Sequence, residues 1–445
     1  MRLPFAAYGN QRRTGGGRGR GLVADLSRWV THDAQERVEC PLVTVPGNTT
    51  PSDIHPTRGY HRAMAIYLDH AATTPIRPEV LEAMLPYLTE HQGNPSSIHA
   101  SGRRARQALD EAREEIARHL GTKPREIVFT ASGTEADNLA VRGVAWAASA
   151  KGRHVVTSAV EHKAILGTTA VLQRQGFEVT VVGVDRYGRV DPEEVAAAIT
   201  DRTTLVSIQS ANNEVGTLQP VAAIGAICRA RGVAFHVDAV QSAAFDAPTP
   251  DAWQATLVSL SAHKLYGPKG AGALYVRQGT AMLPQSSGGA QERQRRAGTE
   301  NVAAIAGLAA AIRLAYADPT DLVPLRDRLI AGATALDGVA LTGHPTERLP
   351  NSASFVIDGV EGGDLVAALD LEGIEASTGS ACTTGSVEPS HVLLAMGIDP
   401  PLAQGSLRLT IGRATTEAEI DRTLEVVGSV IGRLRGLRAP AAVPA

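Results

Sequence analysis

Cysteine is scarce in this sequence. Only Cys40, Cys228 and Cys382 occur among 445 residues. They are odd in number, far apart and without Cys-x-x-Cys spacing, which argues against a disulfide framework and a structural zinc site. Free thiols of this kind are typical of a reducing compartment, so we expect a cytoplasmic protein.

Long apolar runs and a strong net charge are also missing. The longest apolar stretch, residues 301–317, is interrupted by Arg313 and predicts a buried helix rather than a membrane span. The formal net charge is −3 and the pI is near 6.5. Neither value favours direct binding to nucleic acid or to a membrane surface.

The first 63 residues show no sustained apolar periodicity. Residues 9–21 read "GNQRRTGGGRGRG", and residues 41–62 are rich in proline and turn formers. We expect residues 1–63 to be disordered, or to be a mis-assigned extension with Met64 as the real start. The basic, acid-free beginning would also fit a transit peptide, but no amphipathic helical pattern supports that reading.

From Met64 onward, short apolar strands alternate with helical segments. Strands that are apolar throughout, separated by helices, predict an α/β fold with a mainly parallel sheet buried on both faces. After about Asp318 the pattern changes to that of a smaller α+β unit. The predicted organisation is a segment at 64–78 that packs with the small domain, a large domain at 79–318, and a small domain at 319–445.

Polar residues follow the predicted strands, where ligands gather in parallel sheets. Ser132, Gly133 and Thr134 begin a helix whose free N–H groups could bind phosphate, although ordinary capping by Ser132 or Thr134 is the simpler reading of these residues taken alone. Asp238 and Gln241 follow another strand. That carboxylate would be costly to bury without a cationic partner, and the alternative is an exposed aspartate that caps a turn.

A third strand is followed by Ser261, His263 and Lys264. Taken alone, Lys264 reads as a solvated loop lysine, but among small residues it could form a Schiff base. A phosphate site, an acid and a lysine 26 residues after the acid together match the needs of pyridoxal 5′-phosphate. The acid would hold the proton of the ring nitrogen, and the lysine would bind the aldehyde.

Cys382 stands in a run of small polar residues, "STGSACTTGS" at 377–386. Such residues neither bury a thiol nor offer a second thiol to it. Taken alone, the segment reads as a surface loop that contains a cysteine. A thiol that must collect an atom in a pocket and deliver it elsewhere would need the same kind of loop.

The order and spacing of ten motifs resemble the pyridoxal-phosphate cysteine desulfurases, in the class V aminotransferase group of fold type I. The likeness covers about residues 66–434. The motifs are "YLDHAATTP" (67–75), "GNPSSIH" (93–99), "FTASGTEADNLA" (129–140), "EHKAI" (161–165), "NNEVGTLQP" (212–220), "HVDAVQS" (236–242), "SAHKLYGPKG" (261–270), "RAGTEN" (296–301), "GSACTTGSVEPSHVL" (379–393) and "SLRLTIGR" (406–413). The resemblance implies a seven-stranded sheet in the large domain.

The resemblance also implies roles for individual residues. Catalytic roles fall to Lys264, Cys382 and His162, with His162 stacked on the pyridine ring. Arg408 and Asn213 would bind the substrate, and Arg408 would clamp its carboxylate, although without the family it reads as a surface charge on an edge strand. The cofactor contacts implied are Gly133, Thr134, His162, Asn213, Asp238, Gln241, Ser261, His263, Lys264 and, from the neighbouring subunit of a homodimer, Thr299.

The expected activity is that of a cysteine desulfurase, which converts L-cysteine to L-alanine and carries the sulfur as a persulfide on Cys382. The acceptor would be an iron–sulfur scaffold or a tRNA thiolation enzyme. No resident metal is expected, although Cys382 could ligate a transient iron–sulfur cluster together with a scaffold. The alternatives are another class V enzyme, such as a selenocysteine lyase or an aminotransferase, and a non-catalytic sulfur-delivery scaffold.

Overall fold

A computed structural model of the chain describes residues 65–379 and 388–438. The expected N-terminal extension therefore lies outside the described residues. The same holds for Cys382.

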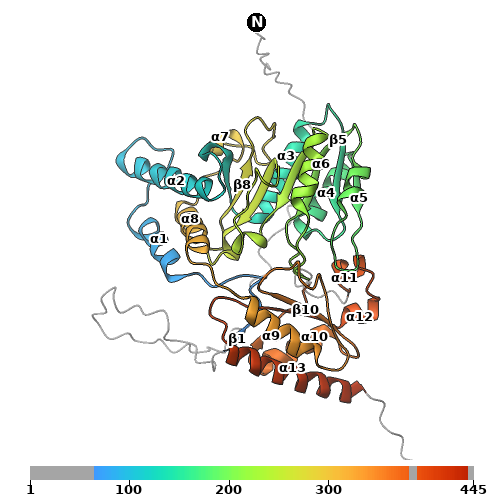
Figure 1. Cartoon of the computed structure of the whole chain (residues 1–445). Coiled ribbons are helices and arrows are strands. Elements are labelled where there is room, and N and C mark those ends of the chain that lie inside the picture. The colour runs from blue at the N-terminus through green and yellow to red at the C-terminus, as the bar shows by residue number, and fades with distance from the viewer. Residues whose placement is uncertain (1–64, 380–387, 439–445) are drawn as a thin grey trace, which may run out of the picture. The chain divides into compact units, whose positions relative to one another are not determined.

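The largest sheet has seven strands in the order β2-β8-β7-β6-β5-β3-β4 (Figure 1). β8 runs antiparallel to both of its neighbours, and every other neighbouring pair is parallel. This confirms the α/β class with a mainly parallel sheet. The strands are β2 Ile127–Thr130, β3 His154–Ser158, β4 Glu178–Val182, β5 Thr203–Gln209, β6 Ala234–Asp238, β7 Leu257–Ser261 and β8 Gly272–Val276.

Helices bury both faces of this sheet. Val128 of β2 packs in a core with α3 and α4, whereas its neighbours Ile127 and Phe129 pack in another core with α1, α2, α6 and α8. Since successive side chains of a strand point to opposite faces, burial on both sides explains why these strands are apolar throughout. The helices are α1 Pro78–Thr89, α2 Ala100–His119, α3 Gly133–Ala147, α4 Lys163–Arg174, α5 Pro192–Ala198, α6 Val221–Ala230, α7 Gln291–Gln294 and α8 Val302–Ala317.

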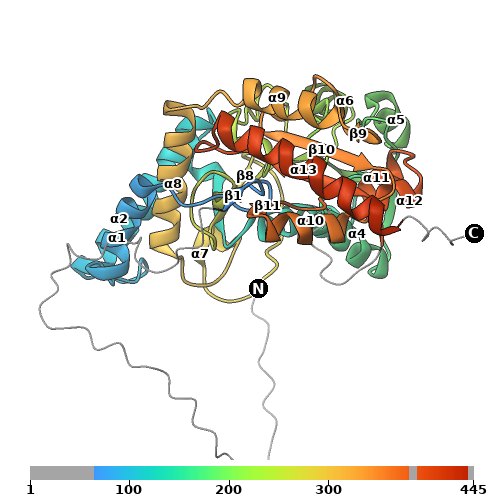
Figure 2. The ribbon, with the colours of Figure 1, turned by 90° about the horizontal axis from the view of Figure 1, so that it is seen from below.

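The C-terminal part contains a three-stranded antiparallel sheet in the order β12-β10-β9. Helices α9, α10 and α13 lie against this sheet (Figure 2). Phe355 and Leu409 of the sheet share an apolar core with side chains of these three helices. The elements are α9 Val323–Thr334, β9 Val339–Leu341, β10 Ser352–Ile357, α10 Gly362–Leu371, β11 Ile374–Glu375, α11 His391–Ala395, α12 Pro400–Gln404, β12 Ser406–Thr410 and α13 Glu417–Arg438.

The first described residues are tied to this C-terminal part. Strand β1, Ile66–Tyr67, pairs in parallel with β11, and Asp69 forms an isolated bridge with Thr410. Three 3-10 turns complete the described elements: η3 Pro124–Glu126, η4 Ser242–Ala244 and η5 Ala262–Lys264. The domain boundaries at 78/79 and 318/319 stay a prediction.

Among residues 65–379 and 388–438, the structure contains no helix that is both long and apolar enough to cross a membrane.

Candidate active site

A cavity of about 380 Å³ opens where several parallel strands end. β2, β3, β5, β6 and β7 all present their carboxyl ends to the same edge of the sheet, so residues far apart in sequence meet there. Ten of the predicted site residues line this cavity: Gly133, Thr134, His162, Asn213, Asp238, Gln241, Ser261, His263, Lys264 and Arg408.

Two predicted residues are not among them. Thr299 is exposed beyond α7 and does not line the cavity, and its contact with a neighbouring subunit stays a prediction. Cys382 lies outside the described residues. The described chain stops at Gly379, which does line the cavity, and resumes at Glu388.

The N-terminus of α3 forms one end of the cavity. Ser132 caps the helix, and its Oγ accepts a hydrogen bond from the N–H of Glu135 at 3.1 Å. Gly133 leaves no room for a side chain, since a Cβ there would lie 2.7 Å from Cγ2 of Val240 and 3.2 Å from Cβ of Ser261. Open N–H groups and close backbone approach make this end suited to a phosphate group.

Ser261 supports the same reading. Its Oγ is buried and has no hydrogen-bond partner among the described residues, although it lines the cavity. A buried hydroxyl left unpaired costs free energy unless a ligand or water completes it. A phosphate oxygen beside Gly133 would be such a partner.

Asp238 ends β6 at the floor of the cavity. Its Oδ1 accepts a hydrogen bond from the N–H of Val240 at 2.9 Å. Burial raises the pKa of Asp238, while the Val240 hydrogen bond and the charges of His162 and Lys264 oppose that rise. A protonated ring nitrogen beside it would add a further cationic partner and favour the carboxylate.

Lys264 lies in η5, directly after β7. Its Nζ donates hydrogen bonds to the carbonyl oxygens of Ala71 and Ala72, the latter at 2.7 Å. Gln241 donates to the same Ala71 carbonyl at 3.0 Å. The carbonyl groups of Ala71 and Ala72 therefore hold the side chains of Lys264 and Gln241 at the cavity. This role of the backbone after β1 could not be predicted from the sequence.

Two histidines flank the lysine and the aspartate. His162 caps α4, and its Nδ1 accepts from the N–H of Ala164 at 3.1 Å, so the neutral ring carries its proton on Nε2. Burial lowers the pKa of His162; Asp238 and Glu214 act against that shift, whereas Lys264 and His391 add to it. His263 contacts Thr73 at 3.2 Å, and burial together with the charges of Lys264 and Lys269 lowers its pKa to about 4.

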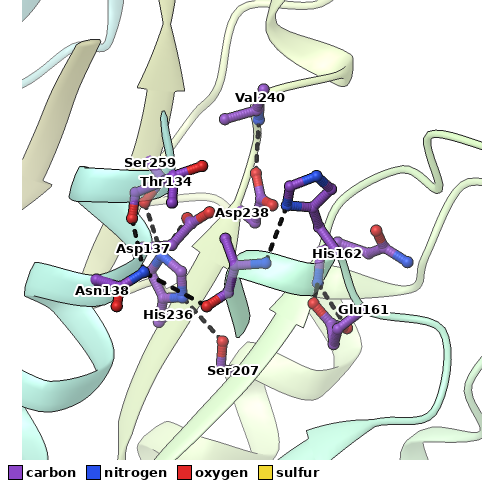
Figure 3. A network of polar contacts seen from close by, with 12 residues as sticks. Thr134, Asp137, Asn138, Glu161, His162, Ser207, His236, Asp238, Val240 and Ser259 are labelled. Carbon is purple, nitrogen blue, oxygen red and sulfur yellow. Dashed lines mark hydrogen bonds and ion pairs between the residues drawn. The ribbon is translucent and has the colours of Figure 1, made fainter. Parts of the chain in front are cut away.

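A buried polar network lies behind Asp238 (Figure 3). The ring of His236 bonds Ser207 from Nδ1 and Ser259 from Nε2, both at 2.9 Å, and burial lowers its pKa to about 3. Asp137, only 1% exposed, lies 3.7 Å from the same ring, and burial raises the pKa of its carboxyl well above the ordinary value.

Sequence reasoning missed Asp137 and His236. Both offered a signal, since a carboxyl group one turn after Gly133 and a histidine two residues before Asp238 interrupt otherwise apolar faces. Their pairing depends on α3 packing over β6, which the sequence alone does not fix.

The interpretation of Arg408 as a surface charge, which its sequence context alone suggested, is wrong. It lies on β12, an edge strand, yet is only 3% exposed. Nη1 donates to the carbonyl of Asn213 at 2.8 Å, and Nη2 donates to the carboxylate of Asp69 at 2.8 Å. Its Nε is buried and has no hydrogen-bond partner among the described residues.

These groups fit pyridoxal 5′-phosphate. The α3 N-terminus and the unpaired Ser261 hydroxyl suit its phosphate, Asp238 suits its ring nitrogen, and Lys264 is an amine for its aldehyde. Gly133, Ser261, Asp238 and Lys264 all line the same cavity. Arg408 is left to receive the carboxylate of an amino acid.

Comparison with known proteins agrees with this arrangement. The family model for class V aminotransferases matches residues 66–423. Two relatives are described as cysteine desulfurase IscS. The one from Methanosarcina thermophila is 49% identical over 84% of this chain and 93% of its own. The one from Dictyoglomus turgidum is 48% identical over 83% of this chain and 95% of its own.

Solved structures give the same result. A NifS-like protein superimposes with a TM-score of 0.78 at 36% identity, covering 83% of this chain and all of its own. DndA from Streptomyces lividans superimposes with a TM-score of 0.66 at 34% identity, covering 77% of this chain and 99% of its own. With its cavity built for pyridoxal 5′-phosphate and its sequence matched from residue 66 to residue 423, the chain belongs to the class V aminotransferase family.

Proposed function

We propose that this chain is a pyridoxal-phosphate-dependent cysteine desulfurase. It converts L-cysteine to L-alanine and leaves the sulfur on Cys382. One observation supports this most: Asp238, Lys264 and Arg408 come from separate elements and converge on one cavity that ends at the α3 N-terminus. Relatives that are nearly half identical to this chain are described as cysteine desulfurases.

The residues at the cavity divide the work between them. Gly133, Thr134 and Ser261 hold the phosphate, and Asp238 keeps the ring nitrogen protonated. When bound, pyridoxal 5′-phosphate supplies an electron sink that weakens the bonds around the α- and β-carbons of cysteine. Lys264 is the amine that holds the cofactor and then moves the substrate's α-proton.

Substrate binding falls to Arg408. Its Nε is unpaired in the described structure, and its Nη2 is held by Asp69. In this proposal the substrate carboxylate pairs with the buried Nε and competes with Asp69 for Nη2, which requires the guanidinium to shift when substrate binds. Such a two-point contact fixes the direction in which the side chain of cysteine points.

Sulfur transfer falls to Cys382. Its thiolate attacks the sulfur of cysteine, a new S–S bond forms, and the Cβ–S bond breaks with its electrons left on carbon. The carbon skeleton gains a proton and leaves as alanine. The sum is L-cysteine plus thiol to L-alanine plus persulfide, which balances without an added oxidant or reductant.

The proposal also covers the location, the oligomeric state and the sulfur acceptor of the enzyme. The enzyme works as a cytoplasmic homodimer in which Thr299 reaches the cofactor phosphate of the neighbouring subunit. The persulfide passes to an iron–sulfur scaffold or a tRNA thiolation enzyme. Trapping the persulfide form with cell extract and identifying what binds would decide between these acceptors.

Product analysis tests the activity. Purified protein with L-cysteine is expected to yield alanine and one protein-bound persulfide in equal amounts. A keto acid as the product would favour an aminotransferase, and a strong preference for selenocysteine would favour a selenocysteine lyase. A protein that binds no pyridoxal 5′-phosphate would favour a sulfur-delivery scaffold.

The anchoring lysine is tested separately by borohydride reduction. We expect the reduced cofactor to stay attached to Lys264. Lys264→Ala should retain some cofactor through the phosphate and Asp238 contacts, yet form no alanine. A label on Lys163 or Lys269 would contradict the assignment.

A further inference from the structure

The turn that carries Asn213 is held rigidly at the wall of the active site. Oδ1 of Asn212 accepts from the N–H groups of Glu214 and Val215, at 2.9 and 2.8 Å. Its Nδ2 donates to the carbonyl of Val160 at 2.9 Å. These three hydrogen bonds hold the backbone from which the Glu214 side chain extends.

Gly379 is held beside this turn. Nη1 of Arg408 donates to the carbonyl oxygens of Asn213 and Gly379, at 2.8 and 3.4 Å. Gly379 has φ +90°, and a Cβ there would lie 3.5 Å from Oε2 of Glu214. A side chain at position 379 would therefore lie against the Glu214 carboxylate, so the two residues are neighbours in the wall of the site.

Ser390, at the start of α11, meets the same carboxylate. Its Oγ donates to Oε2 of Glu214 and accepts from the N–H groups of Val392 and Leu393, at 3.1 and 3.4 Å. The next residue, His391, contacts the carbonyl of Glu161 at 3.0 Å from Nε2. The start of α11 is thus fastened to the Glu214 side chain through Ser390.

Glu214 also contributes charge to the site. It is only 6% exposed, so its interactions are weakly screened by solvent. The charged and titratable groups that face His162 are Asp238, Lys264, Glu214 and His391. Among them, Glu214 is one of the two that stabilise the protonated ring.

We propose that Glu214 is a positioning residue that fastens the N-terminus of α11 to the active-site wall and places a negative charge beside His162. The part that concerns turnover rests on the proposed function, because His162 matters there through its contact with cofactor and substrate. Glu214 takes no direct part in the reaction. It acts only through its hydrogen bond with Ser390 and its charge on His162.

The test follows the titration of His162 in the cofactor-loaded protein. Carbon-13-labelled histidine gives one resonance for each ring, and His162→Asn identifies the relevant one. Glu214→Gln keeps the shape and removes the charge, so the pKa of His162 should fall, and the limb of the pH–rate profile that follows His162 should move to lower pH. Glu214→Asp should keep the charge and restore the wild-type titration.

A matched control uses Glu347→Gln, an exposed carboxylate whose charge does not act on His162. It should titrate like the wild type. If Glu214→Gln also left the His162 titration unchanged, the charge part of the proposal would be wrong. If the wild type made no alanine, the proposed function would be wrong. The effect of Glu214 on the His162 titration would still be measurable, because the His162 resonance is recorded without turnover.

The fastening is tested by thermal melting of the same loaded proteins. Ser390→Ala removes the donor and leaves the charge, so it should lower the melting temperature and keep the His162 titration. Glu214→Ala removes the acceptor of the same hydrogen bond, so the fall in melting temperature of the double variant Glu214→Ala, Ser390→Ala should be smaller than the sum of the two single falls. Additive losses would contradict the fastening.

Discussion

Nη2 of Arg408 donates to the carboxylate of Asp69 at 2.8 Å, although 339 positions separate the two residues in the chain. Asp69 follows the first described strand, and Arg408 lies on the last. Their contact joins the segment after β1 to β12 and holds the guanidinium, which lines the cavity, in place before any substrate arrives. The contact is preorganised, which lowers the cost of ordering that long side chain on binding.

Arg408→Lys is expected to raise KM for L-cysteine. A lysine keeps the charge but loses the forked geometry, so a charge-assisted hydrogen bond of about 1.5–3 kcal/mol is lost, roughly a 10- to 150-fold change. The absorbance of the bound cofactor should stay the same. Steady-state kinetics check this, with Arg413→Lys, an arginine paired with Asp318 outside the cavity, as the control. An unchanged KM would remove Arg408 from substrate binding.

Gly133→Ala is expected to weaken cofactor binding. The added methyl group would lie 2.7 Å from Cγ2 of Val240. Overpacking of this kind costs about 1–3 kcal/mol, so the dissociation constant should rise roughly 5- to 150-fold. Gly167→Ala in α4 is the control, since a Cβ there has no neighbour within 4 Å. Equal cofactor affinity in both variants would contradict the phosphate site at the α3 N-terminus.

The protein stripped of cofactor should become less stable as pH rises toward mildly alkaline values. Burial raises the pKa of Glu161 from about 4.5 to about 8, although Ser158 and Gln209 donate hydrogen bonds to it. The native state therefore keeps a proton that the unfolded state has released. This contribution is fully present below about 4.5 and is lost as pH rises through about 8.

Glu161→Gln cannot release that proton. Whatever its absolute stability, its melting temperature relative to the wild type should therefore rise over the same pH window. Melting curves across that window measure the difference, with the exposed Glu347→Gln as the control. A difference that does not change with pH would mean that Glu161 is already ionised in the native protein.

The part of the site that could be predicted from the sequence depends on one property of parallel sheets. The polar groups after β2, β6 and β7 could be predicted to meet, because parallel strands end at the same edge of a sheet. Lys264 and Asp238 were found in this way. Local sequence patterns were enough to predict the strands and helices, because these patterns are set by neighbouring residues.

Burial and pairing across distant elements could not be predicted. Arg408 looks like a surface charge until Asp69 and Asn213 are placed beside it. Asp137 and His236 face each other only because α3 packs over β6, and Ser390 reaches Glu214 only through the fold of the C-terminal part. Each depends on tertiary contacts between segments that are far apart in sequence.

The central claim is that Cys382 receives the sulfur, and its persulfide is the most direct measure. One turnover with L-cysteine and no acceptor should add the mass of one sulfur atom to the peptide that contains Cys382, and none to those with Cys40 or Cys228. Cys382→Ser should bind cysteine and change the cofactor spectrum, yet release no alanine, because a serine hydroxyl is a poor nucleophile toward sulfur. Near-normal alanine formation by Cys382→Ser, with no sulfur on the protein, would contradict the account.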